Sequence, residues 1–174
     1  MTSCADMAGP APGMARAMPD MPDMRGTEMR TGGCLCGAVR FEARQVPAEA
    51  GICHCAQCRR WTGSALIGVA VPEDAVTWTG AEAIVRYASS DWAERGHCGR
   101  CGTPLFFRLT REGTQWSGQY DMPLGVFDDP EGFSVTSEIW IDHKPGSFAY
   151  AAPETRKQLT RAECLAIFDP GNAA

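Results

Sequence analysis

The chain has 174 residues, of which 44% are hydrophobic, so it can bury one sizeable core but hardly a second large domain. Its formal net charge of -5 argues against a nucleic-acid-binding protein, because such proteins need a basic face for the phosphate backbone. It contains no run of eighteen or more apolar residues and no apolar secretory stretch at the N-terminus, so we expect neither a membrane span nor export.

Residues 1–29 differ in composition from the rest of the chain. Seven of the eight methionines lie there, among alanine, proline, glycine and aspartate, without helical or strand periodicity. Such a segment buries too little apolar surface to offset the loss of chain entropy on folding. We expect a disordered tail over 1–29, or translated sequence upstream of the true start, followed by a single domain over 30–170. A methionine-rich metal-binding tail is the alternative.

From residue 32 onward the sequence predicts short strands separated by glycine, proline or aspartate. The strand-like segments are 38–43, 64–71, 75–79, 84–87, 105–109, 116–120 and 135–141. Short strands with frequent turn residues are typical of an all-β architecture. One short helix is predicted near the C-terminus, where Thr160 and Glu163 have the spacing of a capping box and the Asp-Pro-Gly of 169–171 ends the helix.

Seven of the nine cysteines are clustered. Their three groups are Cys34-Leu35-Cys36, Cys53-His54-Cys55-Ala56-Gln57-Cys58 and Cys98-Gly99-Arg100-Cys101. In an extended strand, residues two apart face the same side, so a C-x-C pair directs both sulfurs to one ion. A C-x-x-C pair brings its sulfurs together around a tight turn. We expect a cytoplasmic location, where thiols stay reduced and clustered cysteines bind metal or take part in catalysis.

Two zinc sites per chain follow from these groups. Zinc prefers four ligands in a tetrahedron, and structural sites fill all four with cysteine or histidine. One complete set consists of Cys34, Cys36, Cys98 and Cys101. The other set, Cys53, Cys55 and Cys58, leaves one position for water, substrate or another side chain, as catalytic zinc sites do. The spacing alone does not dictate which pairs combine.

Two alternatives remain for the second set. A histidine would complete it as another structural site, although His54 lies between two ligands and should point away from the metal, and His97 and His143 are next to the other set or distant in sequence. A redox disulfide is the other alternative. Cys4, in the tail, and Cys164, on the apolar helix face, are poor ligand candidates.

With these motifs the sequence resembles the glutathione-dependent formaldehyde-activating enzyme (Gfa) family, also described as the centromere-protein-V family. The resemblance covers about residues 31–168 and depends on four segments: Gly32-Gly33-Cys34-Leu35-Cys36-Gly37-Ala38-Val39, Cys53-His54-Cys55-Ala56-Gln57-Cys58-Arg59-Arg60-Trp61-Thr62-Gly63-Ser64, Cys98-Gly99-Arg100-Cys101-Gly102-Thr103-Pro104-Leu105 and Leu124-Gly125-Val126-Phe127-Asp128-Asp129-Pro130. It implies a zinc-stabilised folded β-sheet called a β-tent, and the same partition into four and three cysteines.

The resemblance also implies an activity. Enzymes of this family are carbon–sulfur lyases that, in the reverse direction, join glutathione and formaldehyde into S-hydroxymethylglutathione. By that likeness Cys53, Cys55 and Cys58 carry the catalytic zinc, and the other four cysteines the structural zinc. Two departures bear on the substrate: family members commonly have histidine at the position of Glu138, and tryptophan after a proline where this chain has Gly146-Ser147-Phe148.

The candidate chemistry is sulfur transfer. Zinc deprotonates a coordinated thiol, and a site that already holds three thiolates suits sulfur transfer better than water activation. A tripeptide thiol such as glutathione carries two carboxylates, which Arg59 and Arg60 would bind unless they are solvated surface charges. Trp61 would wall the pocket unless it is a core residue. Tyr120 and Asp121 are candidate proton carriers or ligand anchors by their position in the family pattern alone.

The expected partners are therefore a glutathione-like thiol and a small electrophile, with no nucleic acid and no membrane. Homo-oligomerisation is left open. A different class of function is a non-catalytic, zinc-stabilised module that binds another protein, and the acidic charge makes nucleic acid the poorer partner for it.

Overall fold

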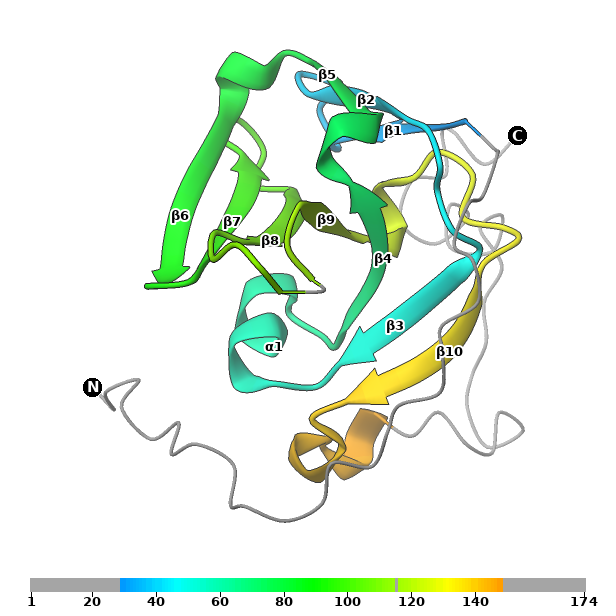
Figure 1. The fold of residues 1–174 in the computed structure, drawn as a ribbon, viewed down its shortest axis with the longest axis vertical. Coiled ribbons are helices and arrows are strands. Elements are labelled where there is room, and N and C mark those ends of the chain that lie inside the picture. Colours follow the sequence, from blue (N-terminus) through cyan, green and yellow to red (C-terminus); the bar gives the residue numbers. More distant parts are fainter. Residues whose placement is uncertain (1–28, 115, 149–174) are drawn as a thin grey trace, which may run out of the picture.

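The computed structural model describes residues 29–114 and 116–148 (Figure 1). This part of the chain is all-β, with one short α-helix, which confirms the predicted fold class. The ten strands are β1 Arg30–Gly33, β2 Arg40–Ala43, β3 Glu49–Cys53, β4 Leu66–Pro72, β5 Val76–Thr79, β6 Ile84–Ser90, β7 Ala93–Cys98, β8 Pro104–Leu109, β9 Gln119–Pro123 and β10 Ser134–Ile139. Helix α1 spans Ala56–Thr62, and single 3₁₀ turns occupy Glu73–Ala75, Ala81–Ala83, Leu124–Val126, Ile141–His143 and Gly146–Phe148.

The strands form two sheets. A three-stranded sheet has the order β1-β2-β5, and a seven-stranded sheet has the order β10-β3-β4-β9-β8-β7-β6. All neighbours are antiparallel except β10 and β3, which run parallel along one edge of the larger sheet (Figure 1). Because β10 follows β9 in sequence but pairs with β3, this edge joins distant parts of the chain.

Three strands were not predicted from the sequence. These are β1, β3 and β7, whose sequences RTGG, EAGIC and AERGHC contain glycine and polar residues and lack a clear alternation. They are strands because their neighbours supply the hydrogen-bonded ladder, and such tertiary context outweighs weak local preference. The predicted segment 116–120 overlaps only the start of β9, which runs to Pro123.

The structure adds one helix to those expected from the sequence. Helix α1 lies between β3 and β4, where no helix was predicted, and the predicted helix near 160–168 lies outside the described residues. Cys55 caps α1: its backbone is extended, and its sulfur accepts a hydrogen bond from the backbone N–H of Cys58. Gly63 ends the helix with a φ of 73°, a conformation that glycine adopts without strain.

An aromatic core joins the two sheets. Phe41 of the small sheet lies 5.6 Å from Trp78 and 5.3 Å from Phe127, measured between ring centroids. Trp78 in turn contacts Phe106 and Tyr120 of the large sheet, whose rings lie 4.4 Å apart. Edge-to-face aromatic pairs of this kind add stability beyond the buried area itself. The inner face of the large sheet is therefore a packed core.

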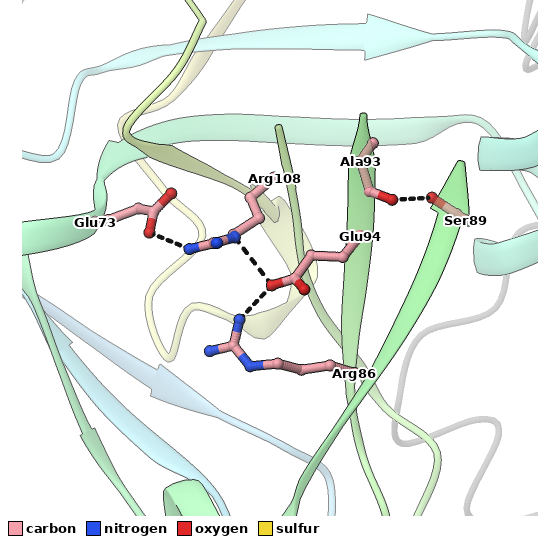
Figure 2. Close-up of polar contacts among 6 residues, drawn as sticks. All are labelled: Glu73, Arg86, Ser89, Ala93, Glu94 and Arg108. Atoms are coloured by element: carbon pink, nitrogen blue, oxygen red, sulfur yellow. Dashed lines mark hydrogen bonds and ion pairs between the residues drawn. The ribbon is translucent and has the colours of Figure 1, made fainter. Parts of the chain in front are cut away.

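Charged side chains connect strands β6, β7 and β8 of the large sheet (Figure 2). Arg108 in β8 pairs with Glu73 at 2.6 Å and with Glu94 of β7 at 2.9 Å. Glu94 also pairs with Arg86 of β6, whose guanidinium lies over the ring of Phe106. Glu94 is therefore fully engaged on the inner face and is not available to groups on the opposite face.

That opposite face of the large sheet carries a different set of side chains. Asp121, Phe107 and Arg95 are successive cross-strand partners in β9, β8 and β7, so they form one row on the same face. In β4, Asp121 pairs with Ala70. Leu66 lies four residues before Ala70 in the same strand and pairs with Cys53 of β3. Since alternate residues of a strand share a face, Cys53 lies on the same face as the row.

Candidate metal centres

Four cysteines meet at one end of the fold. Two come from the loop between β1 and β2, one from the end of β7 and one from the turn that follows it, and they are Cys34, Cys36, Cys98 and Cys101. Their sulfur atoms all lie within 4.8 Å of one another, with 3.6 Å between Cys34 and Cys36 and 3.9 Å between Cys36 and Cys98. A tetrahedron of sulfurs about 2.3 Å from a zinc ion has edges of about 3.8 Å. The set fits a four-coordinate metal ion.

The backbone around this cluster is arranged to favour thiolates. The N–H of Val39 donates to the sulfur of Cys34 at 3.2 Å. The hydroxyl of Thr103 lies 3.2 Å from the sulfur of Cys101, and hydrogen bonds from Thr103 lower the pKa of Cys101 to about 5. For Cys36, the effect of the backbone N–H of Ala38 is outweighed by the neighbouring thiols, which raise its pKa to about 11. A divalent cation would remove this conflict between neighbouring sulfurs.

Three further cysteines meet where β3 runs into α1. Cys53 ends β3, Cys55 caps α1, and Cys58 lies in the first turn of the helix and is buried. Their sulfurs also lie within 4.8 Å of one another. Among the residues that the structure describes, no histidine or carboxylate joins this group of three. The three sulfurs fit one face of a tetrahedral metal site.

The three thiols strongly perturb one another. Contacts with Cys53 and Cys58 lower the pKa of Cys55 to about 2. Contacts with Cys53 and Cys55 raise the pKa of Cys58, and the contact with Cys55 raises that of Cys53. Only one of the three is therefore favoured as a thiolate without a cation. A bound divalent metal ion allows all three to be anionic together.

His54 points away from this cluster. Its ring is only 2% exposed, and its Nε2 lies 2.7 Å from Oε2 of Glu138 in β10. Lys144 donates to the same carboxylate oxygen at 2.9 Å and, with His54, lowers the pKa of Glu138. The backbone N–H of His54 also donates to the carbonyl of Ile139. His54 therefore points away from the cysteine sulfurs, as its position between Cys53 and Cys55 predicted, and its contact with Glu138, which was not predicted, fixes that orientation.

A surface hollow of about 310 Å³ lies beside helix α1. Its lining consists of Ala56, Arg59, Arg60, Gly63 and Phe148. The Nε of Arg59 donates to the carbonyl oxygen of His54 at 3.0 Å, which anchors this side chain beside the cysteines. Arg60 is exposed, and Trp61 is partly buried on the other side of the helix, against Arg95. Two of the predicted binding residues thus share one hollow, and Trp61 does not line it.

Tyr120 and Asp121 lie on opposite faces of β9. Tyr120 packs in the aromatic core, away from the three-cysteine cluster. Asp121 lies on the face that carries Cys53, over Gly68, where a Cβ atom would come within 2.1 Å of the carboxylate. Burial raises the pKa of Asp121 to about 6. Only Asp121 of this pair faces the region of the cluster.

Arg95 is a second residue at the cluster that sequence analysis did not identify. Its Nη2 lies 3.9 Å from the sulfur of Cys58. The residue stands only three positions before Cys98, so in sequence it belongs to the four-cysteine motif. Only the pairing of β7 with β8 turns its side chain toward the other cluster.

An all-β fold with separate clusters of four and three cysteines defines the class: a cysteine-cluster protein with two candidate metal sites. Residues 29–143 match the family model of the glutathione-dependent formaldehyde-activating enzymes, and the chain belongs to that family. A curated relative named uncharacterized lyase C29B12.13, from Schizosaccharomyces pombe, is 30% identical over 120 residues, covering 69% of this chain and 84% of the relative. Together these matches identify a lyase-type enzyme of the Gfa family.

A solved structure supports the fold. The crystal structure of a Rhodobacter sphaeroides protein matches with a TM-score of 0.50 at 23% identity, covering 62% of this chain and 98% of that protein. At this identity the match supports the fold alone. Within the described residues, no helix is long and apolar enough to cross a membrane.

Proposed function

We propose that this chain is a zinc-dependent carbon–sulfur lyase of the S-(hydroxymethyl)glutathione synthase type. It adds glutathione or a similar thiol to formaldehyde or another small electrophile, or catalyses the reverse reaction. The observation that carries the proposal is the convergence of three sulfurs, from Cys53, Cys55 and Cys58, without a fourth ligand among the described residues. Zinc bound there would supply a position at which a substrate thiol is held as a thiolate.

The two clusters have different roles in this proposal. The four cysteines around Cys34 would fill the coordination sphere of a structural zinc and tie the β1–β2 loop to the β7–β8 turn. The three cysteines at the start of α1 would hold the catalytic zinc. Residues 30–170 would form the single catalytic domain, and we expect it to act in the cytoplasm, where glutathione is abundant and reduced.

The hollow beside α1 provides the binding site for the rest of the thiol substrate. Glutathione carries two carboxylates, and a guanidinium can bind a carboxylate through two parallel hydrogen bonds. Arg59 is held near the cysteines by its bond to the carbonyl of His54, and Arg60 reaches the same hollow from the solvent side. The ring of Phe148 provides an apolar wall.

The reaction needs one proton to move. In the forward direction the sulfur–carbon bond forms and the π electrons of the carbonyl pass to its oxygen. That oxygen then takes up one proton, which balances the proton that the thiol released. The carboxyl of Asp121, with its pKa raised to about 6, exchanges protons readily near neutral pH and lies on the face of the sheet that carries Cys53. We assign Asp121 to this proton exchange.

The proposal is tested by exchange kinetics. Thiols add to formaldehyde unaided, so the assay must measure interconversion of ¹³C-formaldehyde hydrate and the S-hydroxymethyl adduct by exchange NMR, with and without enzyme. Cys55→Ser should return the rate to background, whereas Cys4→Ser, the same change outside both clusters, should not alter it. If the native, metal-replete protein adds nothing to the background with any thiol, the proposed activity is wrong.

A further inference from the structure

Arg95 is a buried cation next to the three-cysteine cluster. Only 4% of the residue is exposed. Its guanidinium lies over two aromatic rings, 5.0 Å from the centroid of Phe107 in β8 and 5.6 Å from that of Trp61 in α1. The pairing of Arg95 with Phe107 across β7 and β8 places it on this face, and α1 covers it. The position is fixed by the sheet register and by the helix.

The polar contacts of this guanidinium are few. Its Nη2 lies 3.9 Å from the sulfur of Cys58, while Nε and Nη1 are buried without a hydrogen-bond partner. The adjacent acid in β7, Glu94, faces the other side of the sheet and pairs there with arginines. Among the described residues, the sulfur of Cys58 is thus the polar group that Arg95 contacts.

A buried cation without an anion is strongly unfavourable, and removing either member of a buried charged pair leaves the other uncompensated. The aromatic rings offset part of this cost through cation–π interaction. A neutral thiol offsets little more, but a thiolate supplies a full negative charge. Three thiolates and one divalent cation together carry a net charge of about -1. That charge equals, with opposite sign, the charge of Arg95.

We propose that Arg95 is the built-in counter-charge of the three-cysteine metal centre, a positioning residue that acts through Cys58. With Arg95 the loaded centre is neutral overall, so the protein can bury it. When a substrate thiolate binds the metal ion, the net charge of the centre together with Arg95 is -1, whereas without Arg95 it would be -2. Arg95 therefore makes it easier for the anionic substrate to bind. The inference depends on the proposed function only in requiring that these cysteines bind a metal ion.

Arginine suits this position better than lysine. Its planar guanidinium lies over two rings and is more weakly hydrated than an ammonium group, so burial costs it less solvation free energy. Arg59 and Arg60 do not replace it, because one is held by the carbonyl of His54 and the other is exposed to solvent. Neither shows a contact with a cysteine sulfur in the described structure.

The test is metal affinity, measured without thiol or aldehyde. The chain keeps zinc at the four-cysteine site, which maintains the fold. Cobalt(II) is then titrated into the three-cysteine site against a competing chelator and followed by its ligand-field bands. Arg95→Gln should bind cobalt at the three-cysteine site about 10- to 100-fold more weakly, the range expected for outer-shell partners of a metal ligand. Arg95→Lys, which keeps the positive charge, should lose much less cobalt affinity at this site. The zinc content of the four-cysteine site is the internal reference for a folded chain, and Arg111→Met, at an exposed residue, is the control.

Equal affinity in Arg95→Gln and the native chain, or equal losses in the Gln and Lys variants, would overturn the proposal. If Arg95→Gln does not fold, the double variant Arg95→Leu, Cys58→Ser decides, because removing both charges together leaves neither buried alone. If Arg95 serves as a counter-charge, the double variant should fold. If it does not fold, Arg95 has only a packing role and the proposal is wrong. Since no substrate is present, these outcomes are independent of whether the chain catalyses thiol addition.

Discussion

Replacing Asp121 by asparagine should make the fold more stable at neutral pH. Burial raises the pKa of this carboxyl to about 6 from an ordinary value of 3.8, so the folded protein disfavours the ionised form. The contribution of Asp121 to stability is fully present below pH 3.8 and is lost as the pH rises through about 6. At about 1.36 kcal/mol for each pKa unit, the loss is about 3 kcal/mol once both states are ionised.

The assay is urea unfolding of the metal-loaded native protein and Asp121→Asn, followed by circular dichroism between pH 5 and 8. Both chains share the same cysteines, so pH effects on metal binding cancel in the difference. The advantage of the asparagine variant should grow by about 1.4 kcal/mol across this range, because at pH 5 the native carboxyl is still largely protonated. A difference that is constant with pH would refute the reasoning.

The same substitution should slow catalysis, so the carboxyl of Asp121 would contribute to activity although it lowers the stability of the fold at neutral pH. Loss of a positioned proton carrier typically lowers a rate by about 10²- to 10⁴-fold. Asp121→Asn should therefore be more stable and less active at pH 7.5. A variant with the full exchange rate would remove Asp121 from the proposed mechanism while leaving the stability prediction intact.

Three further predictions concern the cysteines and arginines. Cys98→Ser should unfold the chain, since structural zinc contributes on the order of 10 kcal/mol, and circular dichroism with metal analysis would detect it; a folded variant with both metals would contradict the assigned role. Cys55→Ser should keep the β-sheet spectrum but lose one metal per chain, and retention of two metals would count against the three-cysteine site. The double variant Arg59→Ala, Arg60→Ala should raise KM for glutathione at least tenfold but not for cysteamine, which has no carboxylates, and equal effects on the two thiols would exclude carboxylate binding.

The sequence was informative where chemistry is local. The C-x-C and C-x-x-C spacings fix which sulfurs are near each other along the chain, and the two groups of converging cysteines match the predicted partition. Because adjacent residues of a strand point to opposite faces, the sequence also predicts that Tyr120 and Asp121 lie on opposite faces once they are placed in a strand. It could not tell which face carries the cysteines, because that follows from the register of β9 with β4 and β8.

Other features depended on contacts between distant segments. Strand β7 has the polar sequence AERGHC, and only its pairing with β6 and β8 makes it a strand. Helix α1 is seven residues long, too short for a periodic signal, and it forms where Cys55 caps it beside the cluster. The contact between Arg95 and Cys58 spans 37 residues, and no local pattern encodes it.

The central claim is that a metal ion held by Cys53, Cys55 and Cys58 accepts the sulfur of a substrate. Zinc-edge X-ray absorption of the fully loaded protein tests it most directly. With four sulfurs at one site and three at the other, the mean number of sulfurs per zinc should be about 3.5, rising to about 4 on addition of glutathione. A value that does not change with glutathione, or that is already 4 without it, would contradict the account.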